Sequence, residues 1–184
     1  HSKKSVALAM ILSLGVGANA WAVQQGAIEV GVGTTGSGAT ADGHYGIAIG
    51  NGATASEDNS IAIGSDNQPY GKKTVASADD TIAIGFGATA SNIGDIAIGS
   101  GNNNRNVETI ASGGHSIAIG SYLTQATGSS SIAIGSNTRA TAKYSIAIGS
   151  DIVVSGEYSN SFGYNSVTNA DRANAFGGNA HAWT

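Results

Sequence analysis

The chain has 184 residues and a formal net charge of −4, with eight Lys and Arg against twelve Asp and Glu. This acidic balance argues against a nucleic-acid partner, which would require a basic face. The absence of cysteine excludes a disulfide framework. With 28 glycines and 41% hydrophobic residues, the chain has few large side chains for a thick core. A thin core repeated along one axis fits this supply better.

The N-terminal segment 1–22 has the layout of an export signal. Lys3 and Lys4 precede an apolar run over 6–16, and small residues suited to a cleavage site follow it. An apolar run of this length is too short to span a bilayer. We therefore predict a secretory signal peptide at 1–22 and one mature domain at 23–184, which is more acidic because both lysines are removed.

The tetrapeptide Ile-Ala-Ile-Gly recurs through the rest of the chain. A short fixed step interrupted by insertions is typical of a solenoid. The pattern continues in altered form at 160–163 and 174–177, which makes nine coils, and 28–31 is a weaker tenth. The seven copies begin at Ile47, Ile61, Ile82, Ile96, Ile117, Ile132 and Ile146. The steps between successive starting positions are 14, 21, 14, 21, 15 and 14 residues.

A small side chain stands six positions before every copy, even where the interval is long. The extra residues must then leave the roll just after the glycine, as loops near 65–73 and 100–106. Segments 47–81 and 82–116 repeat the same order of motifs, so duplication of a two-coil unit would place both loops on one side. The small residues are Ala41, Ala55, Ala76, Ala90, Ala111, Ala126 and Ala140.

Alternation along each Ile-Ala-Ile strand assigns its residues to two faces. We expect the isoleucines to project into the roll and the alanine between them to project outward. An unbroken outward line of methyl groups suits a close contact between chains, since an extended apolar patch usually marks an interface. The alternative is that alanine is only tolerated in a tight coil. The predicted interface between chains consists of Ala48, Ala62, Ala83, Ala97, Ala118, Ala133 and Ala147.

No catalytic, cofactor or metal site is predicted. His44 and His115 occupy turns before different strands, without a carboxylate at ligand spacing, and are interpreted as solvated turn residues. A nucleophile with a base and an orienting group cannot be assigned. Recognition should instead use loops and outer faces. The candidate ligand contacts are Gln68, Tyr70, Lys72, Lys73, Asn102, Asn103, Asn104, Arg105 and Tyr122.

The repeat resembles that of a known family. Ser-Ile-Ala-Ile-Gly-Ser at 116–121, 131–136 and 145–150, with Ala six positions before the next copy, resembles the head repeat of trimeric autotransporter adhesins, the YadA-like family. The His-x-Lys-Lys start before the apolar run is also similar to the end of their extended signal peptides.

The resemblance implies an all-β fold, a left-handed parallel β-roll, with three chains side by side. It implies display on the surface of a Gram-negative bacterium and non-enzymatic attachment to host extracellular matrix, host cells or other bacteria. The family's neck, coiled-coil stalk and β-barrel anchor have no counterpart in 1–184, so the chain is interpreted as a head fragment. Anchoring in the outer membrane would come from a C-terminal region outside it.

Two other functions are compatible with a solenoid. A secreted roll could bind ice or another crystalline surface through a flat array of threonines, but the threonines here are irregularly placed. A hexapeptide-repeat acyltransferase would need a turn of about 18 residues, which does not fit the shorter step of this chain.

Overall fold

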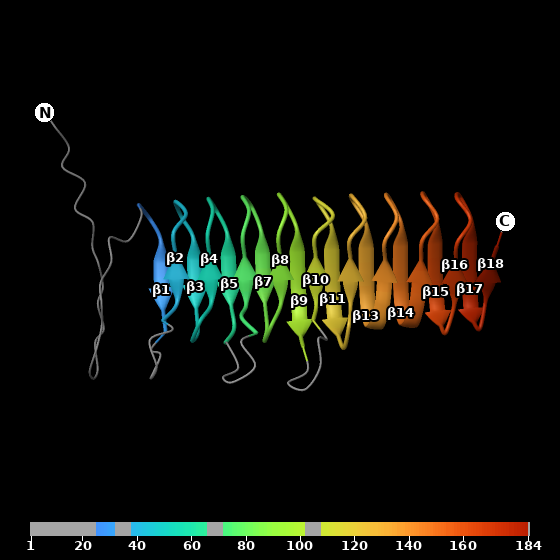
Figure 1. Ribbon diagram of the computed structural model, residues 1–184, viewed down its shortest axis with the longest axis horizontal. Coiled ribbons are helices and arrows are strands. Elements are labelled where there is room, and N and C mark those ends of the chain that lie inside the picture. The colour runs from blue at the N-terminus through green and yellow to red at the C-terminus, as the bar shows by residue number, and fades with distance from the viewer. Residues whose placement is uncertain (1–24, 32–37, 66–71, 102–107, 184) are drawn as a thin grey trace, which may run out of the picture.

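The computed structural model describes residues 25–31, 38–65, 72–101 and 108–183. These residues contain strands, turns and bends but no helix, and all eighteen strands belong to one parallel sheet wound into a roll (Figure 1). The predicted all-β parallel roll is therefore confirmed. Within the described residues no helix could cross a membrane. The predicted signal peptide at 1–22 lies outside the described residues.

Each coil contributes one strand to each of two stacks. The first stack consists of β1 (Ile28–Val30), β3 (Ile47–Ile49), β5 (Ile61–Ile63), β7 (Ile82–Ile84), β9 (Ile96–Ser100), β11 (Ile117–Ser121), β13 (Ile132–Ala140), β14 (Ile146–Val154), β15 (Asn160–Tyr164) and β17 (Asn174–Gly178). The second consists of β2 (Thr40–Ala41), β4 (Thr54–Ala55), β6 (Val75–Ala76), β8 (Thr89–Ala90), β10 (Ile110–Ala111), β12 (Gln125–Ala126), the C-terminal parts of β13 and β14, β16 (Val167–Thr168) and β18 (His181–Ala182).

The register follows the sequence repeat from end to end. Ile47 pairs with Ile61, and the weaker motif beginning at Ile28 pairs with the one beginning at Ile47. The altered motifs also stay in register, because Ile146 pairs with Asn160 and Asn160 with Asn174. All ten motifs therefore form successive coils, and the basic step of the sequence repeat is the length of one winding.

The orientation of the strands is the reverse of the one expected. Ala48, Ala62 and the five other alanines at the same position are fully buried within the single chain. The isoleucines on either side of them are only half-buried. Alanine therefore faces the interior and isoleucine the outside. The assignment of the seven alanines to a trimer interface is wrong, because these side chains have no surface left to contact another chain.

The interior is too narrow for larger residues at most positions. Alanines of the second stack, such as Ala55 and Ala76, face those of the first stack and are also fully buried. Serine or threonine precedes most Ile-Ala-Ile strands and is buried as well, as Ser60 and Thr81 are. Methyl and hydroxyl groups thus fill most of the core, and the largest side chains that are fully buried are Ile152 and Val154.

A column of glycines permits the coils to stack closely. Gly120 has φ +156°, and a Cβ placed on it would lie 1.8 Å from the carbonyl oxygen of Gly135 in the next coil. The same clash would arise at Gly135 and Gly149, at 1.6 and 1.8 Å. Residues with φ in this range are usually glycine. The approach of the next coil therefore requires glycine after the Ile-Ala-Ile strands, and at most of these positions, though not at Gly64, the positive φ requires it as well.

Buried threonines support this column. The hydroxyl of Thr124 donates to the carbonyl oxygen of Gly135 at 2.6 Å, and the carbonyl oxygen of Ser121 lies 3.1 Å from the same hydroxyl. Thr74 and Thr138 make the corresponding bonds to glycine carbonyls at 2.6 and 3.1 Å. Each hydroxyl satisfies a carbonyl group at the point where the chain turns from the first stack to the second, so the turns of successive coils are bonded to one another.

Candidate binding surfaces

The most apolar surface of the roll is the outer side of the first stack. Two isoleucines per coil are half-buried there, from β3 to β14, in two columns that run along the axis. We call this surface the isoleucine face. It consists of Ile47, Ile49, Ile61, Ile63, Ile82, Ile84, Ile96, Ile98, Ile117, Ile119, Ile132, Ile134, Ile146 and Ile148. Extended exposed apolar surfaces of this kind usually mark a contact with another molecule.

The composition of this face changes in the last two coils. Phe162 and Phe176 continue one isoleucine column and stack with ring centroids 5.2 Å apart and an interplanar angle of 1°. Asn160 and Asn174 continue the other, and the amide of Asn160 donates to Asn174 Oδ1 at 2.8 Å. Phe176 is 67% exposed. In the last two coils the face therefore keeps one apolar column, and its other column becomes polar.

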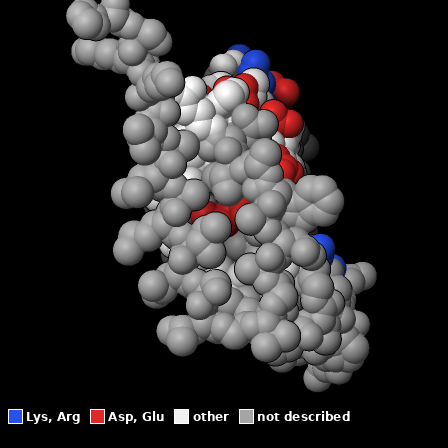
Figure 2. All heavy atoms as spheres, turned by 90° about the vertical axis from the view of Figure 1, so that its left-hand side faces the viewer, with Lys and Arg blue, Asp and Glu red and all other residues white. Residues whose placement is uncertain are grey.

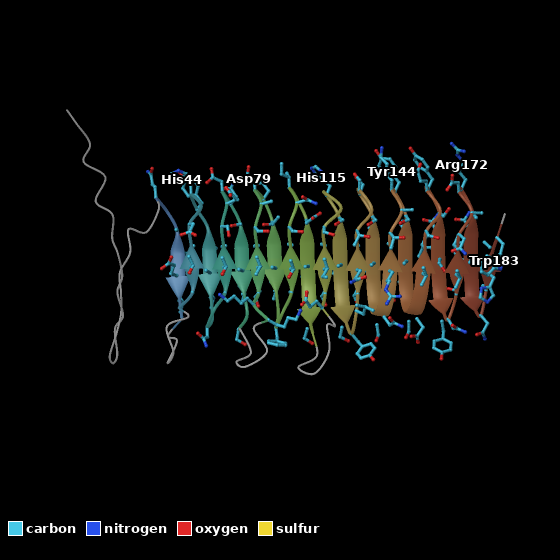
Figure 3. The ribbon with its side chains drawn as sticks, viewed as in Figure 1. His44, Asp79, His115, Tyr144, Arg172 and Trp183 are labelled. Carbon is cyan, nitrogen blue, oxygen red and sulfur yellow. The ribbon has the colours of Figure 1, made fainter. Side chains whose placement is uncertain are left out.

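One long edge of the roll consists of the turns that precede the first-stack strands, and we call it the turn edge. Figure 3 labels His44, Asp79, His115, Tyr144 and Arg172 along it. The residue two positions before each strand has a positive φ, and its backbone N–H donates to the preceding coil, as Tyr158 does to the Lys143 carbonyl at 3.1 Å. These bonds hold the exposed turn side chains at the spacing of the coils.

The turn edge differs in chemistry from one end to the other. Toward the C-terminus, the rings of Tyr144 and Tyr158 stack at 5.0 Å, Lys143 lies over the first ring, and Arg172 lies over the second. Toward the N-terminus the exposed side chains are mainly acidic and bond to neighbouring turns: Asp58 Oδ1 accepts from the His44 backbone N–H at 2.8 Å. The other acidic residues there are Asp42, Glu57, Asp79 and Asp80.

The opposite edge carries the candidates predicted from the inserted segments. Lys72 Nζ forms an ion pair with Glu108, which joins the end of the first inserted segment to the end of the second. The two insertions therefore do leave the same side of the roll. Lys73 and Tyr122 are exposed. The remaining candidates lie outside the described residues: Gln68, Tyr70, Asn102, Asn103, Asn104 and Arg105.

Tyr122 occupies a specific position in this edge. Its φ is +54°, its side chain is 43% exposed, and its carbonyl accepts from the Asn137 backbone N–H at 2.7 Å. The next coils have polar residues at the corresponding turn, where Asn137 Nδ2 donates to Asp151 Oδ1 at 2.7 Å. Tyr122 thus places an aromatic ring at the N-terminal end of a polar turn column, but no described contact brings it together with Lys72 or Lys73.

The described residues contain no group of three or more His, Asp or Glu side chains placed to hold a metal ion. His44 and His115 lie on the turn edge in different coils, as their place in the sequence indicated. His181 stacks on Trp183 at 5.6 Å at the C-terminal end.

Sequence reasoning missed two sets of surface residues. The isoleucine face was assigned to the core, although the residues on the other side of most strands are small, chiefly Ser, Thr, Ala and Gly, and fit a narrow interior. The stacked pair Tyr144 and Tyr158 was also missed, although the two residues occupy the same position in successive repeats, which places both side chains in one column.

A comparison with protein-family models assigns these coils to a family. The YadA head domain repeat (2 copies) matches residues 35–53, 41–67, 76–102, 107–122 and 126–151, more than half of the chain. The chain belongs to the YadA head repeat family. The five matches follow one another along the described coils, so the YadA head repeat is the unit from which this roll is built.

Among solved structures, this YadA-type roll is similar to the crystal structure of the collagen-binding domain of the Yersinia adhesin YadA. The two are 18% identical with a TM-score of 0.40, and the similarity covers 87% of this chain and 81% of that one. A comparison with curated protein sequences gives no match.

Proposed function

We propose that this YadA-type roll is the head of a bacterial surface adhesin. It is exported by the signal peptide at 1–22, is displayed at the outer membrane, and attaches the cell to host extracellular matrix, host cells or other bacteria without catalysing a reaction. Membership of the YadA head repeat family is the observation that carries this proposal. Outer faces and edges bearing exposed aromatic, charged and apolar side chains support it.

The proposal includes a homotrimer assembled through the isoleucine face rather than through the alanines. Fourteen half-buried isoleucines are a large apolar area for one small chain to leave in water. Burial of such side chains provides about 25 cal/mol for each Å² removed from solvent. A second copy of the chain has the same distance between coils, so its isoleucine columns match those of the first copy along their whole length.

Paired substitutions test the assembly. Ile119→Thr with Ile134→Thr keeps β-branching but places hydroxyls on the face, whereas Gln125→Thr changes the outer side of the second stack and serves as the control. We expect native mass spectrometry to give three chains for the wild type and the control, and fewer for the double variant. Circular dichroism reports whether the roll persists. A wild type that remains a single chain would contradict the trimer.

Binding should use many weak contacts multiplied over coils and chains. The exposed candidates are Lys73 and Tyr122, on the edge from which the insertions leave, and Tyr144 and Tyr158, on the turn edge. Binding of the purified wild-type assembly is measured on an array of glycans and matrix proteins, including collagens. We expect binding to at least one matrix or cell-surface component, weakened by Tyr122→Ser or by Tyr144→Ser with Tyr158→Ser. Absence of binding to the array, to host cells and to bacteria would contradict the adhesive function.

Binding to ice or another crystal is the alternative, and the outer side of the second stack is the surface that it would use. The outward column there includes Thr54, Ile110, Gln125, Arg139 and His181 and so lacks a uniform threonine array. Measurement of thermal hysteresis discriminates the two functions, and we expect none.

A further inference from the structure

A glutamate stands where every intact repeat has an inward alanine, in the first coil of the roll. β1 pairs with β3 so that Glu29 is opposite Ala48, which is fully buried. The side chain of Glu29 therefore starts on the interior side of the first stack, at the N-terminal end. Its carboxylate reaches the second stack, where Oε1 accepts the backbone N–H of Ala41 at 2.8 Å.

The accepted N–H belongs to β2, which has no preceding neighbour among the described strands of the second stack. On β2, the backbone N–H groups of Thr40 and Asp42 donate to Ala53 and Ala55 of the next coil, at 2.8 and 2.9 Å. Successive N–H groups of a strand point to opposite sides, so that of Ala41 points toward the N-terminal end. No strand of the described residues lies there, and the carboxylate of Glu29 takes the place of a strand carbonyl.

The first stack likewise has no further described strand at this end, since β1 pairs only with β3. Ile28 donates to the Gly46 carbonyl and Val30 accepts from the Gly50 N–H, so both residues pair toward β3 and the backbone of Glu29 faces away from it. The side chains of Ile28 and Val30 are 49% and 55% exposed. Figure 2 faces this end, and acidic side chains are visible on it between atoms of residues that are not described. Among the described strands none pairs with this side of Glu29, and a strand edge of this kind with exposed aliphatics is a template for another strand.

We propose that Glu29 closes the N-terminal end of the roll and prevents two heads from joining end to end. A second copy that docked its own first coil here would bring two carboxylates into the contact and remove both from water. Burial of unpaired like charges is strongly unfavourable, and inward-pointing charges are one of the devices by which proteins protect open edges. The partner excluded in this way is the N-terminal coil of another copy, which exposes the same β1 edge and the same aliphatics.

The test uses the whole mature chain with Glu29→Ala and Glu29→Gln, and with Glu57→Ala as a control at an exposed turn. Sedimentation across a concentration series measures particle mass, and amide exchange measures protection of Ala41. We expect Glu29→Ala to double the particle mass relative to the wild type and to speed exchange at Ala41 about tenfold, the effect of losing a hydrogen bond to a charged acceptor. Glu29→Gln keeps an acceptor but loses the charge, so its mass should double with a smaller change in exchange.

Particle masses are compared with that of the wild type, so the test does not depend on whether the wild type has one chain or three. Glu57→Ala should match the wild type in both measurements. Electron micrographs should show rods of doubled length for the two Glu29 variants. An unchanged mass in both Glu29 variants, or unchanged exchange at Ala41 in Glu29→Ala, would overturn the proposal.

Discussion

Asp95 Oδ1 accepts two hydrogen bonds from Ser116 in the next coil, one from its backbone N–H and one from its hydroxyl, both at 2.8 Å. The other carboxylate oxygen accepts the backbone N–H of Asn92 at 3.0 Å. Asp95 is fully buried at a position where most other coils have serine or threonine. A charged group is tolerated in this narrow interior because its two oxygens share three donors.

Removal of this carboxylate should destabilise the roll. Asp95→Ala leaves the buried N–H of Ser116 without its acceptor, and we expect a loss of about 2–4 kcal/mol in the free energy of unfolding, since hydrogen bonds to charged groups are the more costly ones to lose. Asp95→Asn should lose less, because its amide oxygen can still accept from Ser116 while its NH₂ group faces the Asn92 N–H. Urea unfolding measures both.

The exposed carboxylate of Asp42 provides the control for Asp95. Asp42→Ala should change the free energy of unfolding by no more than about 0.5 kcal/mol, as is usual for surface positions. Equal effects of Asp42→Ala and Asp95→Ala would show that burial of the carboxylate contributes nothing to stability.

Three glycines separate backbone strain from steric clash. Gly120 has φ +156° and faces the Gly135 carbonyl, Gly177 has φ +111° with no atom near the position of a Cβ, and Gly178 has an open Cβ position without a positive φ in the strained range. We expect Gly178→Ala to be nearly neutral, Gly177→Ala to cost about 1–2 kcal/mol from strain alone, and Gly120→Ala to cost more than either. Thermal unfolding of the three variants measures the order. A Gly120→Ala variant as stable as Gly177→Ala would rule out close stacking of the glycine column.

The period and the register of the coils could be predicted from the sequence because both are set by spacing. A fixed repeat step places Ile117 beside Ile132 whichever way the strand faces, and insertions do not disturb it when they leave at one fixed point. The facing of Ile117 and Ala118 could not be derived from alternation alone, since alternation defines two faces without saying which one is buried.

The distance between the two stacks decides which side of each strand is buried. That distance depends on all of the small residues of a coil together. Ala118, its neighbour Ser116 and the alanine of the opposite strand must fit between the stacks, and no isoleucine would fit with them. The role of Asp95 could not be predicted for a similar reason, because its partner Ser116 is brought to it by the stacking of two coils that an inserted segment separates in the sequence.

Replacement of one inward alanine by a larger residue directly tests which side of the strand is buried. Ala118 is fully buried between the stacks, so Ala118→Val should lower the free energy of unfolding by about 1–3 kcal/mol through overpacking. Ile119→Val, which removes one methylene from the outer side of the same strand, is the control and should cost about 0.5–1.5 kcal/mol at most. Urea unfolding compares the two. An Ala118→Val variant with wild-type stability would place this residue on an open surface.

The hydroxyl of Thr124 should contribute more to stability than its methyl group does. Thr124 is fully buried, and its Oγ1 donates to the Gly135 carbonyl at 2.6 Å. Thr124→Val keeps the shape but leaves that carbonyl without the hydroxyl, so we expect a loss of about 1–3 kcal/mol. Thr127→Val, at an exposed turn of the same coil, is the control and should stay within about 0.5 kcal/mol of the wild type. Thermal unfolding measures both, and native-state amide exchange should locate the loosened turn at Ser121 to Thr124. Equal stability of the two variants would mean that water or another donor replaces the hydroxyl, and that the coils do not depend on this bond.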